Sequence, residues 1–135
     1  MRRKLLMCFG LAAALVMTSD LTFAHHGSGV SYDMGKMVTM KGTVTEFQWK
    51  NPHVYILYDV KDDTGDVVNW GAETHSPVVC EDQDGWTKST LKPGDQITIS
   101  VFLSKTGAPR GLLAKIVFND KVIIDDVSRG RDAGQ

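Results

Sequence analysis

The stretch "SPVVCEDQDGW", residues 76–86, decides the fold, because it predicts a short helix in a chain that otherwise reads as strands and turns. Ser76 is a good N-cap residue, and Pro77 suits the first helical position. Gly85 can end the helix in a left-handed conformation. We therefore expect one helix here, with Val79 turned toward the core.

Three strand-like segments precede the helix, at residues 38–49, 54–60 and 67–73. In the first segment the apolar side chains change parity near Thr45 and Glu46, which predicts a β-bulge or sharp bend. The turn between the second and third segments is short. These two segments are therefore expected to form an antiparallel hairpin.

Two further strands follow the helix, at residues 96–103 and 112–118, and a short "VII" segment comes after them. The first of these strands alternates strictly between apolar and polar residues. The resulting order, β-β-β-α-β-β, is that of an OB-fold, a five-stranded and partly open barrel. We predict an all-β, OB-like small barrel with one short helix; another small barrel or a sandwich is the alternative.

The first 24 residues resemble a secretory signal peptide. "MRRK" supplies a charged start, and an apolar run of 13 residues follows it, too short to span a bilayer as a helix. Thr22 and Ala24 are small enough for the positions before a cleavage site. Cleavage would place the mature chain in the periplasm or outside the cell, starting at His25. An uncleaved N-terminal anchor is the alternative.

The mature chain would comprise an extended arm at 25–36, the OB-like domain at 37–126 and a disordered tail at 127–135. It has 111 residues, with 12 Lys and Arg against 15 Asp and Glu, a formal net charge of −3. No basic cluster remains for nucleic acid, and no basic amphipathic segment remains for a membrane surface. We expect no stable membrane insertion after the signal is cleaved. Cys8 would leave with the signal, so Cys80 cannot form an intrachain disulfide and is expected to be buried.

The register of the predicted hairpin follows from its apolar stripes. Facing residues of an antiparallel pair lie on the same side of the sheet. Aligning the two stripes pairs Tyr58 with Trp70, and Ile56 with Ala72. This alignment fixes which residues meet at the end of the hairpin opposite the turn, which we call the hairpin base.

At the hairpin base, the same register sets Tyr55 opposite Glu73 and His53 opposite His75. Directly opposed Cβ atoms lie about 4.5–5.5 Å apart. Two imidazoles at that separation can share one metal ion, at about 2.0–2.1 Å per bond. Glu73 lies on the same face and could serve as a third ligand or as a base.

A chain cut before His25 presents an α-amine and an imidazole on one residue, a pair of nitrogens that suits square-planar Cu(II). His26 offers another donor, and the arm is long enough to reach back to the hairpin base. The sequence therefore predicts a copper or zinc site with His25, His53 and His75 as ligands and with His26 and Glu73 as alternates.

Two other interpretations stay open. The histidines can be ordinary polar residues at strand ends, in which case the barrel is an interaction module for an envelope protein or a small molecule. Trp49 and Trp86, expected to be exposed, would then be its anchors, with Tyr55, Asn51 and Glu73 beside them. An enzyme would need a metal with an open position and Glu73 as base, so we expect binding rather than catalysis.

Several short motifs occur in a fixed order along the chain: "AHHGS", Trp49-Lys50-"NPH", a Trp-x-x-Glu ending at Glu73, Ser76-Pro77, Gly85-Trp86 and "LKPGD". In this pattern the chain resembles a family of small exported bacterial proteins known only as a domain of unknown function. The resemblance covers most of the mature chain and implies export and a small β-barrel, but no substrate. Gly27 stands where members of the family often have Ser.

Overall fold

A computed structural model describes residues 28–126 of the 135-residue chain. The predicted signal peptide, His25 and His26, and the predicted tail at 127–135 lie outside these residues. The description of the fold and of the site below therefore concerns residues 28–126.

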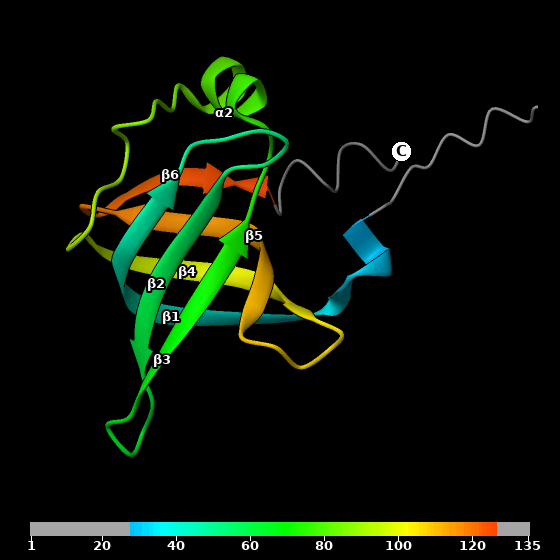
Figure 1. Ribbon diagram of the computed structural model, residues 1–135, viewed down its shortest axis with the longest axis vertical. Coiled ribbons are helices and arrows are strands. Elements are labelled where there is room, and N and C mark those ends of the chain that lie inside the picture. Colours follow the sequence, from blue (N-terminus) through cyan, green and yellow to red (C-terminus); the bar gives the residue numbers. More distant parts are fainter. Residues whose placement is uncertain (1–27, 127–135) are drawn as a thin grey trace, which may run out of the picture.

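The described chain is built from strands, one short α-helix and one 3-10 turn (Figure 1). The elements are η1 (Ser28–Val30), β1 (Tyr32–Gln48), β2 (Tyr55–Lys61), β3 (Val67–Glu73), α2 (Pro77–Asp84), β4 (Gln96–Ser104), β5 (Arg110–Phe118) and β6 (Lys121–Asp125). The predicted all-β class, with a single short helix between the third and fourth strands, is confirmed.

The strands form one sheet in the order β3-β2-β1-β4-β5-β6, and an additional parallel pairing of β3 with β5 closes the first five strands into a ring. This strand order and the position of α2 are those of an OB-fold. β6 lies outside the ring and pairs with β5. The sequence indicated it only as a short apolar segment.

β1 is long because it pairs with two neighbours. Its first part pairs with β4 and its last part with β2. The predicted bulge is present between Val44 and Glu46, where the register to β2 shifts. The strand begins at Tyr32, inside the segment 25–36 that was expected to be an arm, rather than at Val38. Its first residues thereby reach the edge of the cavity described below.

The helix has the predicted caps. Ser76 Oγ accepts a hydrogen bond from the Val79 backbone N–H, Pro77 begins the helix, and Gly85 ends it at φ 66°. The Gly85 N–H donates to the Glu81 carbonyl at 3.0 Å. No helix within residues 28–126 has both the length and the apolar character needed to cross a membrane.

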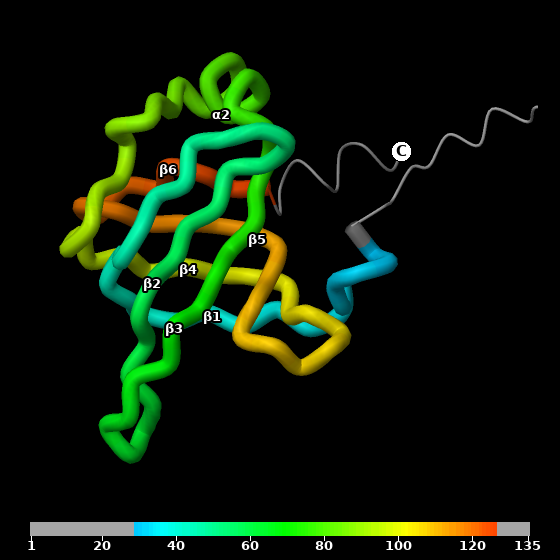
Figure 2. The backbone as a smooth tube through the Cα atoms, viewed as in Figure 1, coloured from blue at the N-terminus to red at the C-terminus, as the bar shows by residue number. Residues whose placement is uncertain are grey.

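Buried apolar side chains form one core within the ring. The segment around α2 covers one end of the ring (Figure 2). Cys80 is buried there, as predicted. Trp86 was expected to be exposed, and this was wrong: only 2% of its surface is accessible. Its Nε1 donates to the Ile123 carbonyl at 3.0 Å, and its ring meets Phe47 edge-on at a centroid distance of 5.9 Å. The left-handed turn at Gly85 carries the chain back over the end of the ring, which makes Trp86 a core residue.

Candidate functional site

The β2–β3 hairpin has the register that the sequence predicted. The three predicted pairs are Tyr58 with Trp70, Ile56 with Ala72, and Tyr55 with Glu73. The hairpin base is therefore where the sequence placed it.

Beyond Glu73 the ladder continues irregularly. The Val54 N–H donates to the His75 carbonyl at 2.8 Å, and the Thr74 N–H donates to the Val54 carbonyl at 3.0 Å. Two residues thus lie opposite Val54, which is the pattern of a β-bulge. The extra residue shifts the register before His53 is reached, so His53 and His75 do not form the directly opposed pair that was expected.

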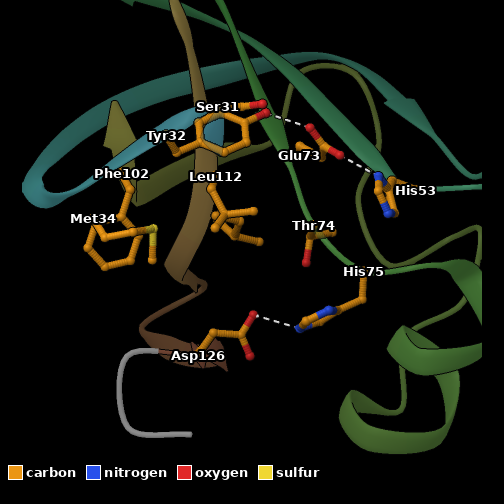
Figure 3. A pocket seen from close by; sticks show the side chains of 11 residues that line it. Ser31, Tyr32, Met34, His53, Glu73, Thr74, His75, Phe102, Leu112 and Asp126 are labelled. Carbon is orange, nitrogen blue, oxygen red and sulfur yellow. Dashed lines mark hydrogen bonds and ion pairs between the residues drawn. The ribbon is translucent and has the colours of Figure 1, made fainter. Parts of the chain in front are cut away.

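A cavity of about 330 Å³ lies at the hairpin base, and we call it the base pocket (Figure 3). It takes residues from the start of β1, from both strands of the hairpin base, from β4 and β5, and from the segment after β6. Its lining residues are Ser31, Tyr32, Met34, His53, Glu73, Thr74, His75, Phe102, Leu112, Leu113 and Asp126. The predicted site residues His53, Glu73 and His75 are therefore brought together on one cavity.

Glu73 joins two distant parts of the chain. Its Oε1 forms an ion pair with His53 Nδ1, and its Oε2 accepts a hydrogen bond from the Tyr32 hydroxyl at 2.5 Å across 41 residues of sequence. Burial, and then the interaction with Glu73, raise the pKa of Tyr32. The same two causes raise the pKa of Tyr55, the cross-strand partner of Glu73. Tyr32 and Tyr55 thus stay protonated beside the carboxylate.

His75 makes a separate pair with Asp126, with Nε2 and Oδ2 3.1 Å apart. Both imidazoles are partly accessible, 46% for the His53 side chain and 45% for His75, whereas each carboxylate is 18% accessible. Figure 3 shows the two rings turned toward different carboxylates on the same side of the base pocket. Each ring orientation is therefore held by its own acidic partner.

Thr74 lies between these two pairs. Thr74 is only 5% accessible, and its hydroxyl oxygen accepts no hydrogen bond within the described chain. Figure 3 shows the hydroxyl directed into the base pocket. Burial raises the pKa of the Cys80 thiol to about 11, and a side-chain hydrogen-bond interaction with the Thr74 hydroxyl lowers it. Within residues 28–126 no group donates to the buried Thr74 oxygen, and a buried acceptor without a donor costs free energy, so Thr74 is a group that a ligand N–H could satisfy.

The remaining walls are apolar, with Phe102 from β4 and Leu112 and Leu113 from β5. Among residues 28–126, no lysine or arginine lines the base pocket. The base pocket therefore has an acidic, hydrogen-bonding wall and an apolar floor.

The predicted ligand contacts lie elsewhere. Trp49 is half-buried and packs on Phe47 at a centroid distance of 5.8 Å. Asn51 is exposed in the loop before β2, and Tyr55 interacts with Glu73, its cross-strand partner. None of these three predicted contacts is among the described residues that line the base pocket.

Tyr32, Thr74 and Asp126 were missed by the sequence interpretation. Tyr32 and Asp126 come from opposite ends of the described chain, and only closure of the ring brings them to the hairpin base. The position of Thr74 depends on the bulge. The sequence offered one signal for Thr74, a hydroxyl directly after Glu73, and a hydroxyl at that position does not by itself indicate a role.

In the part of the chain that the structure describes, no three or more His, Cys, Asp or Glu side chains are grouped so as to hold a metal ion. The predicted set also contains His25 and His26, which lie outside residues 28–126. The copper or zinc site stays a prediction.

A family model described as "Family of unknown function (DUF6152)" matches residues 13–114, which is most of the chain. The chain belongs to this family, in agreement with the resemblance found in its motifs. No curated protein matches the sequence.

Proposed function

We propose that this member of the DUF6152 family is an exported binding protein, working in the periplasm or outside the cell, and that its base pocket holds a small organic ligand. The observation that carries the proposal is the base pocket itself: about 330 Å³, with polar groups on one wall and apolar side chains on another. Small-molecule sites are typically about 300–1,000 Å³, mostly apolar, with a few placed polar groups.

The polar wall is arranged before any ligand arrives. Glu73 holds His53, and Asp126 holds His75, so neither imidazole has to be ordered on binding. Groups that are already oriented cost less conformational entropy when a ligand binds. This arrangement supports binding with defined orientation rather than nonspecific apolar contact.

Export is supported by the N-terminal sequence alone, with its charged start, its apolar run and its small residues before His25. The test is to express the full chain, recover it from the periplasm and determine its first residue. We expect His25. A protein retained with Met1 in the membrane or cytoplasmic fraction would contradict export.

The ligand site can be tested with a matched pair of substitutions on β1. Met34 and Met37 are each 47% accessible, but only Met34 lines the base pocket. Met34→Trp should block the cavity, while Met37→Trp adds the same bulk outside it.

Ligand-observed NMR would use a mixture of small aromatic alcohols, amines and acids. We expect signals of bound fragments with the wild type and Met37→Trp and their loss with Met34→Trp. Equal binding by all three proteins, or none by the wild type, would contradict the proposal.

Metal binding is the second candidate, and one observation favours it. His53 has Nδ1 held by a carboxylate, the arrangement that orients metal-ligating histidines through their other nitrogen. The described chain reaches the base pocket at Ser31, six residues after His25. Six residues can span about 20 Å. Copper or zinc could then be bound by His25, His53 and His75, with His26 and Glu73 as further donors.

The metal version has its own test. Cu(II) and Zn(II) would be titrated into the wild type, into His53→Ala, and into a protein with one extra residue before His25. Metal bound at this site should be weakened by His53→Ala, and an added residue should weaken Cu(II) by removing the terminal amine chelate. Binding unchanged in both proteins would exclude this site.

A further inference from the structure

We infer that the ligand of the base pocket is a small organic cation, an ammonium group joined to an apolar body. The inference rests on the proposed function and narrows it to one chemical class. It follows from the charge of the polar wall, from the Thr74 hydroxyl and from the apolar floor.

As long as the Glu73 and Asp126 carboxylates are ionised, the polar wall has no net positive charge. With neutral imidazoles, His53 and His75 donate N–H groups to Glu73 and Asp126, and the wall carries two negative charges. With both imidazoles protonated, the charges of the wall cancel. Since no lysine or arginine of residues 28–126 lines the base pocket, an anionic ligand finds no net positive charge on this lining. A cation is attracted to the wall when the imidazoles are neutral, and it meets no net repulsion when they are protonated.

The Thr74 hydroxyl adds a directional contact. An ammonium group has three donors and no acceptor, so it needs oxygen atoms around it. The Thr74 hydroxyl oxygen is buried, accepts no hydrogen bond from within residues 28–126 and is directed into the cavity (Figure 3). It lies on the wall between the Glu73 and Asp126 carboxylates. Accepting one ammonium proton would satisfy this hydroxyl, and the carboxylates would neutralise the charge.

The opposite side of the base pocket selects the rest of the ligand. Met34, Phe102 and Leu112 line it, from β1, β4 and β5. These side chains suit an aromatic or branched hydrocarbon group, and an aromatic ring beside a cation adds further attraction. A fully polar cation would leave this surface uncovered.

Three probes with nearly the same skeleton and different charge test the inference: 2-phenylethylamine, 2-phenylethanol and phenylacetate. Their affinities for the wild-type protein would be measured by NMR titration at neutral pH. We expect the amine to bind in the millimolar range, the alcohol more weakly, and phenylacetate weakest, with roughly a tenfold difference between amine and acid.

A second matched pair identifies the wall. Asp126 lines the base pocket, whereas the neighbouring Asp125 does not line it and pairs with Lys115 at 3.4 Å. Asp126→Asn should weaken the amine roughly tenfold while leaving 2-phenylethanol unchanged. Asp125→Asn, which removes the same charge one residue away, should leave both probes unchanged. Glu73→Gln replaces Asp126→Asn as the wall variant if that protein does not fold.

The outcomes separate the inference from the proposed function. Equal affinity for the amine and the alcohol, or tighter binding of phenylacetate, overturns the cation inference but leaves a ligand pocket. Equal loss of amine binding in Asp126→Asn and Asp125→Asn also overturns it. If none of the probes binds the wild type, both the inference and the proposed function fail.

Discussion

The two ends of the β2–β3 hairpin use polar side chains in opposite ways. At the turn end, which we call the hairpin tip (residues 61–67), the hairpin projects from the body (Figures 1 and 2). There Asp62 Oδ1 accepts hydrogen bonds from the Thr64 hydroxyl at 2.6 Å and from the Asp66 backbone N–H at 2.9 Å. At the hairpin base, Glu73 and His75 bind partners from distant parts of the chain.

The difference separates a structural turn from a candidate site. The Asp62 carboxylate is satisfied by residues no more than four positions away, and its charge serves the turn. At the hairpin base the partners arrive only when the ring closes, and their side chains surround a cavity instead of filling it. Polar side chains that long-range contacts hold around a cavity are typical of a binding site, and the hairpin base has this arrangement.

Shortening one side chain in the middle of the hairpin should have the largest effect on stability. Ile56 is fully buried, and Ile56→Ala should lower the free energy of unfolding by about 2–5 kcal/mol. Val67, at the hairpin tip, is 56% accessible, and Val67→Ala should change stability by less than about 0.5 kcal/mol. Urea denaturation of both variants measures the contrast. Similar losses would mean that the hairpin tip is packed against something in solution.

Raising the pH should destabilise the region behind the hairpin base. Burial, helped by the Asp84 and Asp126 carboxylates, raises the pKa of the Cys80 thiol from 9.0 to about 11. Between these values the unfolded chain has lost the thiol proton and the folded chain keeps it. The unfolded state then binds fewer protons, so stability falls as the pH rises through this window. The loss should reach about 2–3 kcal/mol by pH 11.

The control for the alkaline effect is Cys80→Ala. Urea denaturation from pH 7 to pH 11 should show a shallower decline for this variant than for the wild type, with the tyrosines responsible for what remains. Reaction of the thiol with iodoacetamide at pH 8 should be slow in the folded wild type and fast in urea. Parallel pH curves for the two proteins would show that the thiol ionises equally in both states.

Removing one long-range contact at the hairpin base should lower the free energy of unfolding by less than the two preceding changes. Tyr32→Phe deletes the hydroxyl that donates to Glu73, and we expect a loss of about 0.5–1.5 kcal/mol. A double-mutant cycle with Glu73→Gln isolates the interaction from the effects of each change alone. Additive effects would mean that the start of β1 is not tied to the hairpin base in solution.

Much of the fold could be predicted because its determinants are local. The caps of α2 are Ser76 and Gly85, both readable in place, and the bulge in β1 follows from a parity change. The hairpin register followed from two short apolar stripes up to Glu73.

The rest depended on contacts between distant residues. Trp86 is buried because Phe47 and Ile123 meet it over the end of the ring, and no pattern near Trp86 indicates them. The bulge at Thr74 separates the two imidazoles that a regular ladder would have paired. The sequence therefore predicted His53, Glu73 and His75 at the hairpin base. It could not predict Asp126, because only the folded chain brings Asp126 to His75.

The smallest expected effect lies at the hairpin tip and tests whether its carboxylate is confined to a structural role. The Thr64 hydroxyl, and then the backbone N–H groups of Asp66, Thr64 and Gly65, lower the pKa of Asp62 from 3.8. A lowered pKa means that the folded state favours the ionised form, so this stabilisation is present above pH 3.8 and is lost as the pH falls below it. Because Asp62 is fully exposed, the effect should be slight.

Asp62→Asn should flatten the acid side of the stability curve a little, whereas Asp63→Asn, which removes a neighbouring charge, should not. Neither change should alter the binding of 2-phenylethylamine, since a polar group that is satisfied within its own turn has nothing left to offer a ligand at the other end of the hairpin.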